Sequence, residues 1–113
     1  MARIVAKGVQ PTPTFVKMPN VEVIANIVAD SNKAYWIDTS VAPITLTLPA
    51  NPSMGDILRI FDVENTFDTN NLTIDRNGKP IMGANDNLTV NIEGSAFEII
   101  FYNDTKGWRL FTI

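Results

Sequence analysis

The residues of this chain that could do chemistry are carboxylates, lysines, tyrosines and the hydroxyls of serine and threonine. Its 113 residues include no histidine and no cysteine, which removes the commonest general base, the cysteine nucleophile and the usual ligands of transition metals. Five acidic residues lie in the segment 62–86 without the spacing of a DxDxDG-type calcium loop: Asp62, Glu64, Asp68, Asp75 and Asp86. We expect these to be solvated loop carboxylates, and we predict no metal, no cofactor and no catalytic residue.

The segment Asp38-Thr39-Ser40 sets two hydroxyl groups beside a carboxylate. A hydroxyl needs an adjacent base to become a nucleophile, and without histidine nothing here fills that role. A glycosidase would need two carboxyl groups facing each other across a cleft, for which a domain of this length has little room. The segment is therefore expected to be a turn, and the sequence favours a protein that is not an enzyme.

Three aromatic residues have the right chemistry to stack on the apolar face of a sugar, because a broad ring can bind while its polar tip stays in water: Tyr35, Trp36 and Trp108. Neighbouring residues of a strand point to opposite faces, so Tyr35 and Trp36 cannot both be deep in one core. Two interpretations stay open for the three residues. One is packing in the core or against another subunit, and the other is contact with a glycan.

A repeated strand is the clearest structural element of the chain. Residues 71–78 read NLTIDRNG and residues 87–94 read NLTVNIEG. In each copy apolar residues alternate with polar ones, which is typical of a half-buried strand, and each copy ends at a glycine that indicates a turn. Both copies match the N-glycosylation pattern, but their position at a strand start favours an asparagine that closes a turn.

The rest of the chain has the same kind of pattern. Short apolar-rich segments recur between turn residues at 21–29, 33–38, 44–48, 56–63, 97–102 and 108–113. The predicted fold is all-β, an antiparallel β-sandwich or barrel-like domain over residues 21–113. Residues 57–61 and 97–102 are apolar on both faces, so these strands are either central to the domain or covered by another subunit.

Residues 1–20 are expected to form an extended basic arm. Its prolines stiffen it, because each fixes its own φ and biases the preceding residue toward extended geometry; they are Pro11, Pro13 and Pro19. Residues 1–17 contain no acid and carry three cations, Arg3, Lys7 and Lys17. Because the net charge of the whole chain is −3, the remaining residues carry a net charge of −6. The arm is either a solvated terminus or a docking element for an acidic partner surface.

Nucleic acid and membranes are not the expected partners. Contacts to phosphates need clustered Lys and Arg, which the acidic body lacks. No stretch approaches the roughly 18 apolar residues of a membrane span, and charges interrupt the apolar residues at the start of the chain, unlike in a secretory signal. We expect a soluble product that stays where it is made.

Together, these strand and turn signatures resemble a β module of tailed-bacteriophage virion proteins, which occurs on tail fibres and in head-decoration proteins. The resemblance covers residues 30–113 and rests on residues 34–40 (AYWIDTS), 44–49 (ITLTLP), 55–56 (GD), 66–74 (TFDTNNLTI), 76–78 (RNG) and 107–110 (GWRL). It implies a non-enzymatic virion structural protein, assembled in the host cytoplasm.

A module behind only a short arm favours a capsid decoration or cement protein, anchored to the particle through Arg3, Lys7 and Lys17. The alternative is a receptor-binding or carbohydrate-binding module of a tail fibre or head fibre. The implied partners are other copies of the chain, forming a trimer, and virion proteins such as the major capsid protein. A host surface glycan would be the partner of the alternative.

Overall fold

A computed structural model describes residues 18–112, which form nine strands and no helix. The strands are β1 (Asn20–Val23), β2 (Ile27–Val28), β3 (Lys33–Ile37), β4 (Ile44–Thr47), β5 (Ile57–Asp62), β6 (Leu72–Asp75), β7 (Leu88–Val90), β8 (Ala96–Asn103) and β9 (Gly107–Thr112). The predicted all-β fold of short strands is confirmed. Within the described range there is accordingly no helix that is long and apolar enough to cross a membrane.

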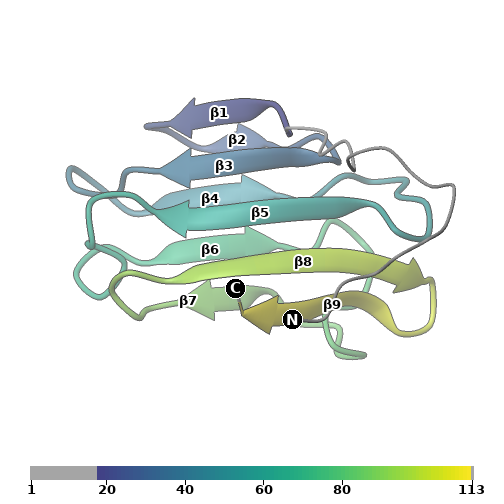
Figure 1. The fold of residues 1–113 in the computed structure, drawn as a ribbon. Helices are drawn as coiled ribbons and strands as arrows, with labels where there is room; N and C mark the ends of the chain where they lie inside the picture. The colour runs from purple at the N-terminus through teal and green to yellow at the C-terminus, as the bar shows by residue number, and fades with distance from the viewer. Residues whose placement is uncertain (1–17, 113) are drawn as a thin grey trace, which may run out of the picture.

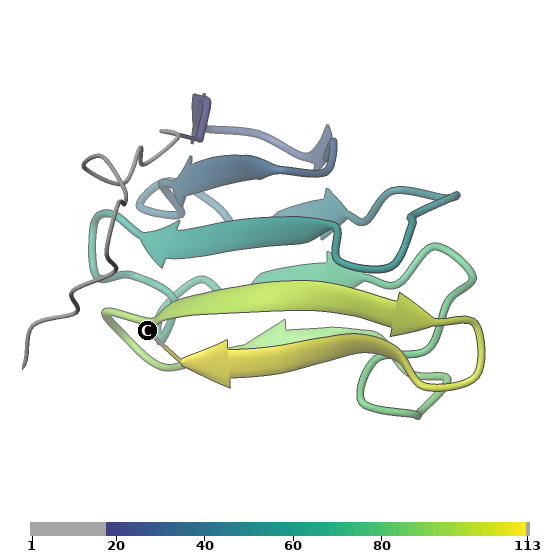
Figure 2. The same cartoon turned by 45° about the vertical axis from the view of Figure 1, so that its right-hand side comes forward.

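The strands form two sheets that lie face to face (Figure 1). Sheet A has the order β1-β3-β5-β8-β9, and sheet B has the order β2-β4-β6-β7. The turned view in Figure 2 separates the two layers. Side chains that point between the layers make one hydrophobic core, which consists of Val23, Ala29, Tyr35, Ile37, Ile44, Leu46, Leu48, Leu58, Ile60, Phe67, Leu72, Ile74, Ile81, Phe97, Ile99, Phe101 and Trp108.

The direction of the strands differs from the antiparallel arrangement that we expected. From β1 to β6 the chain alternates between the sheets, so each strand pairs with the strand two further along, and these pairs are parallel. A parallel pair needs a connection that returns to the starting end, and here a strand of the other sheet provides it in place of a helix. The last three strands add the antiparallel pairs β5/β8, β6/β7 and β8/β9. The sandwich therefore consists of two mixed sheets.

The two copies of the repeated phrase become β6 and β7. These strands pair with each other in antiparallel register, so that Leu72 lies opposite Val90 and Thr73 opposite Thr89. The glycine that ends each copy has a positive φ, +93° in the first and +72° in the second. The prediction of a repeated strand that ends in a glycine turn is confirmed.

The N-terminal part of the sheet begins slightly earlier than the expected domain boundary. Strand β1 starts at Asn20, and the carbonyl of Pro19 accepts a hydrogen bond from the N–H of Ala34 at 2.9 Å. The strand expected over residues 21–29 is divided into β1 and β2 by a bend. Residues 1–17, which make up most of the expected arm, lie outside the described residues.

Strands β8 and β9 correspond to the expected segments 97–102 and 108–113, and they pair as a hairpin. Its turn requires glycine at position 107, where φ is +69°. A Cβ atom there would lie 1.8 Å from the carbonyl oxygen of Pro80. The same oxygen accepts the N–H of Trp108 at 2.8 Å, so the close approach fastens the loop before β7 to the start of β9.

Candidate interaction surface

The outer face of sheet A carries aromatic and aliphatic side chains. On β3, β5 and β8 the inward positions are buried, and the alternate positions point outward. We call the large apolar side chains among these outward positions the aromatic face, which consists of Trp36, Ile57, Phe61, Ile100 and Tyr102. Trp36 and Tyr102 are exposed, and the other three are half-buried. The strands predicted to be apolar on both faces therefore do have a second apolar face, and in the monomer it lies on the outside.

The outer face of sheet B differs in chemistry. Its central row consists of Thr45, Thr73 and Thr89, which lie beside one another on β4, β6 and β7. Hydroxyl groups on a solvated sheet face satisfy their hydrogen bonds with water and need no partner. A row of outward aromatic side chains is therefore a property of sheet A, whereas on sheet B the strongly exposed apolar residue is Val28 of the edge strand β2, at 69%.

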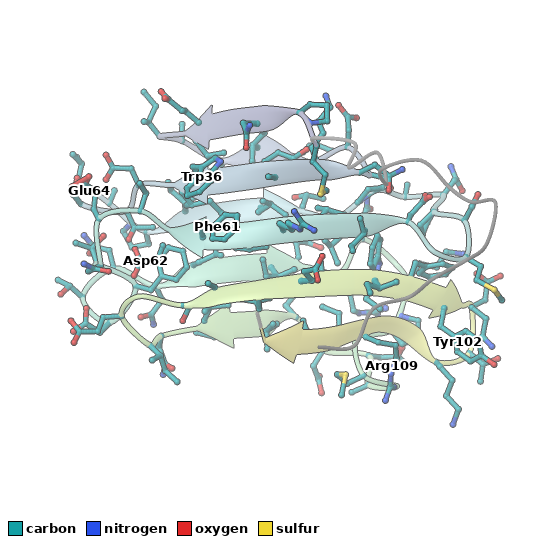
Figure 3. All side chains as sticks on the ribbon, viewed as in Figure 1. Trp36, Phe61, Asp62, Glu64, Tyr102 and Arg109 are labelled. Carbon is teal, nitrogen blue, oxygen red and sulfur yellow. The ribbon has the colours of Figure 1, made fainter. Side chains whose placement is uncertain are left out.

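An aromatic pair stands at one end of the aromatic face, near the last residues of β3 and β5. Trp36 lies directly opposite Phe61 in the register of β3 and β5, and their ring centroids are 4.2 Å apart at an angle of 15° (Figure 3). The indole Nε1–H donates to Oδ1 of Asn20 at 2.9 Å, which fixes the ring from the β1 side. Even so, 37% of Trp36 is exposed. The chain thus presents an oriented indole whose polar atom already has a partner.

An ion pair lies beside the stacked rings on the same face. Nε of Arg59 donates to Oε2 of Glu98 at 3.0 Å, across the paired strands β5 and β8. Glu98 is only 7% exposed although it points outward. Opposite charges that lie directly across two strands stabilise the pairing modestly. The pair also leaves the middle of the aromatic face without net charge.

A cleft of about 650 Å³ opens beside Trp36, at the end where the parallel strands β1, β3 and β5 finish. Parallel neighbours end at the same edge of a sheet, so the residues that follow them come together there. The lining consists of Asn20, Glu22, Val23, Ile24, Trp36, Asp38, Val63 and Glu64. Because three of these eight are carboxylates and none is basic, we call it the acidic cleft. Figure 3 shows Glu64 at this end of the sheet and Tyr102 at the other.

The carboxylate of Asp38 has a fixed geometry. Hydrogen bonds from the hydroxyl and the backbone N–H of Ser40 hold the pKa of Asp38 below its usual value, and the N–H donates to Oδ1 at 2.8 Å. The segment 38–40 is thus a turn closed by its own side chains, as the sequence predicted. Asp38 contributes a stable negative charge to the acidic cleft.

Asp62 holds the loop that carries Val63 and Glu64 into the acidic cleft. Its carboxylate accepts three backbone N–H groups, from Thr66 at 3.1 Å, Phe67 at 3.0 Å and Gly94 at 3.0 Å. Asp62 is buried within β5, so the expectation of a solvated loop carboxylate is wrong for this residue. A buried carboxylate is tolerated when hydrogen bonds replace its hydration, and here these bonds join the ends of β5 and β8.

The other four acidic residues of the segment 62–86 also have definite places. Asp75 belongs to β6 and accepts the N–H of Asn77 at 2.9 Å, so it too is structural. Glu64, Asp68 and Asp86 are exposed outside the strands, which confirms the expectation for these three. Among residues 18–112 no three acidic side chains gather closely enough to hold a metal ion.

Three aromatic residues were predicted as contacts for a core, a subunit or a glycan, and of these Trp36 is accessible on the surface. Tyr35 is 1% exposed, and its hydroxyl accepts the N–H of Asp30 at 2.7 Å and donates to the carbonyl of the same residue at 3.0 Å. Burial raises the pKa of Tyr35, so the hydroxyl stays protonated and keeps donating. Trp108 is fully buried and packs edge-on against Phe101 at 5.3 Å. Both are removed from the candidate site because they lie between the sheets.

The positions of Arg3, Lys7 and Lys17 lie outside the described residues. The repeated asparagines can be placed, and Asn87 uses its side-chain oxygen to accept the N–H of Arg76 at 2.9 Å. This bond links the start of the second repeat to the residue that follows β6, eleven positions earlier in the chain, so Asn87 joins two strands and does not close a turn of its own.

A second cleft of about 650 Å³ lies at the opposite edge of the sandwich, where β7 and β9 are the last strands of their sheets. Its apolar lining includes Leu88, Val90, Ile92, Phe97 and Leu110. Ile92 is 69% exposed. The core is therefore incompletely covered at this edge, which adds a second area of accessible apolar surface.

No protein-family model and no curated protein sequence matches this chain. The geometry of its surfaces is therefore the basis on which its function is argued.

Proposed function

We propose that this protein is a non-enzymatic structural component of a bacteriophage particle, a decoration or cement protein that acts by covering and joining other subunits. The aromatic face is the observation that carries the proposal. The cross-strand pairs Trp36–Phe61 and Ile57–Ile100 stabilise the sheet, yet they leave apolar area in water that a contact surface would cover. The resemblance of residues 30–113 to a virion β module supplies the setting.

The proposed assembly has two kinds of contact. Copies of the chain associate through the aromatic face, most simply as a trimer, the state that the resemblance implies. Residues 1–17, with Arg3, Lys7 and Lys17, anchor the protein to an acidic surface on the particle, such as one formed by the major capsid protein. Part of that attachment is electrostatic and weakens as salt rises.

A glycan-binding module of a tail fibre or head fibre is the second candidate function. The exposed indole of Trp36 favours it, because an oriented ring beside polar side chains suits a sugar. A glycan array separates the candidates. Binding that is lost in Trp36→Ala and kept in Tyr102→Ala would establish the second function in place of the first.

Immunogold labelling of virions tests the proposal. Antibodies raised against the full-length protein would be applied to particles from the culture that produces it. Regularly spaced label over the heads is the expected result, and label on fibres alone would replace it by the second candidate. Particles that carry no label, in a preparation where the antibody detects the purified protein, would refute the virion assignment.

The self-association of the purified protein is a separate test of the aromatic face. Light scattering coupled to size exclusion at micromolar concentration should give the mass of a trimer of the 12.5-kDa chain. Ile100→Lys should yield monomers, because a charge would enter the middle of a buried contact. Thr73→Lys places the same charge on the outer face of sheet B and should leave the mass unchanged. A monomeric wild-type protein would remove the aromatic face as a contact between copies.

A further inference from the structure

The acidic cleft selects for a positively charged ligand. Its three carboxylates, on Glu22, Asp38 and Glu64, are strong hydrogen-bond acceptors. The lining offers few side-chain donors in return, because Nε1 of Trp36 is already bonded to Asn20. An anionic sugar or a phosphate would be repelled, and a neutral sugar would leave three negative charges uncompensated.

The indole of Trp36 adds an aromatic wall that suits the same ligand. Phe61 covers one side of the ring and is not part of the cleft lining, so the open side of the ring faces Glu22, its neighbour across β1 and β3. A cation that lies against an indole is attracted by the negative face of the ring. Ile24 and Val63 supply apolar contact for an aliphatic stem. An ammonium or guanidinium group on such a stem is the side chain of lysine or arginine.

The chain itself contains the matching segment. Residues 1–17 carry three cations and no acid, whereas the rest of the chain is strongly acidic. Extended, 17 residues reach at most roughly 60 Å, which is enough to span from one small domain to the next. In a particle where copies stand side by side, the basic segment of one copy can therefore reach the acidic body of a neighbour.

We propose that the acidic cleft binds a lysine or arginine side chain from residues 1–17 of a neighbouring copy, with the cation against the open side of Trp36 and among the three carboxylates. The inference rests on the proposed function, in that it assumes adjacent copies. It gives one cation of the basic segment a binding site on a neighbouring copy, and the remaining cations stay available for the particle surface. The contact shares Trp36 with the aromatic face, and its other residues are separate.

Carbodiimide cross-linking of the full-length protein tests this directly, because the reagent joins an amine to a carboxylate that is in contact with it. An equal mixture of ¹⁴N-labelled and ¹⁵N-labelled protein distinguishes the source. Mass spectrometry should find Lys7 or Lys17 joined to Glu22, Asp38 or Glu64, with about half of these pairs carrying one label of each kind. Pairs that always carry a single label would show a segment folded back within its own copy and would overturn the proposal. The absence of such pairs both in the wild-type protein and in Arg3→Lys, which gives the reagent an amine at that position, would overturn it as well.

A peptide titration provides the second measurement. A fluorescent synthetic peptide of residues 1–17 should bind the full-length protein at low salt, and a peptide with its three cations replaced by glutamine should not. The double variant Glu22→Gln and Glu64→Gln should weaken binding about fivefold, and Trp36→Leu about threefold.

The matched control is Asp86→Asn with Glu93→Gln, which removes the same charge away from the cleft and should bind as the wild-type protein does. Equal weakening in control and cleft variants would mean attraction to net charge alone and would refute the site. Neither outcome bears on whether the protein decorates virions, which the immunogold experiment decides separately.

Discussion

Replacing Asp62 tests whether this carboxylate organises the end of sheet A. It accepts three backbone N–H groups, and that of Phe67 is buried whereas those of Thr66 and Gly94 are partly accessible to water. A hydrogen bond to a charged group contributes about 1.5–3 kcal/mol, and less where water can replace it. Asp62→Ala should therefore lower the free energy of unfolding by about 3–5 kcal/mol, a large share of the stability of a small domain.

Asp62→Asn tests the hydrogen bonds alone, because it keeps a side chain of the same shape in the buried position. Oδ2 receives the N–H groups of Phe67 and Gly94, and Oδ1 receives that of Thr66. An asparagine whose oxygen takes the Oδ2 position keeps two bonds and loses the third, so the expected cost is about 1–2 kcal/mol.

Urea unfolding followed by circular dichroism at neutral pH measures both variants of Asp62. Asp86→Ala serves as the exposed control and should change the unfolding free energy by less than about 0.5 kcal/mol. A loss below about 1.5 kcal/mol in Asp62→Ala would show that water satisfies the three N–H groups equally well. Equal losses of unfolding free energy in Asp62→Ala and Asp62→Asn would show that the contributions of the three hydrogen bonds are not additive.

Three other substitutions probe the turns. Gly107→Ala should cost at least about 3 kcal/mol, because its Cβ would lie 1.8 Å from a backbone oxygen; Gly78→Ala, where φ is +93° and nothing lies within 4 Å, should cost about 1–2 kcal/mol from backbone strain alone. Thermal melts compare the two glycine variants, and equal losses of stability would show that the close approach to the oxygen of Pro80 does not cause the larger cost at Gly107. Ser40→Ala should raise the pKa of Asp38, which an NMR titration follows; since the folded-state pKa is lowered, the ionised form stabilises the fold above the ordinary pKa, and this contribution disappears as pH falls through the folded value. An unchanged pKa of Asp38 in Ser40→Ala would contradict the assignment of its cause.

Periodicity was sufficient to locate the strands, and it was insufficient to pair them. Alternating apolar residues placed β3 and β4 within one residue of their observed ends. The same alternation specifies which side chains face inward, but it carries no information about which strand lies alongside. Short connections between successive strands usually indicate hairpins, which are antiparallel. In this fold they pass from one sheet to the other, so the parallel pairing was not predicted.

The candidate site was predictable to the same extent. Trp36 was correctly separated from Tyr35 because neighbours in a strand face opposite sides. Asp62 was missed although a signal existed: it continues the inward series of Leu58 and Ile60 at a spacing of two, so a carboxylate there had to be buried and bonded. The acidic cleft had no comparable signal, because its carboxylates are brought together by the pairing of strands and not by spacing along the chain.

Strand direction accounts for both the position of the cleft and its limits. Because β1, β3 and β5 are parallel, the chain leaves all three at the same end of sheet A, which brings Glu22, Asp38 and Glu64 to one edge. Strand β8 runs the other way and begins at that edge, so the chain arrives there instead of leaving. Trp36 lies on the middle one of the three parallel strands, with the stacked ring of Phe61 on one side and the cleft on the other. The aromatic face and the acidic cleft thus share this ring but use opposite sides of it, and for that reason substitutions on either side can separate the contact between copies from the binding of a basic segment.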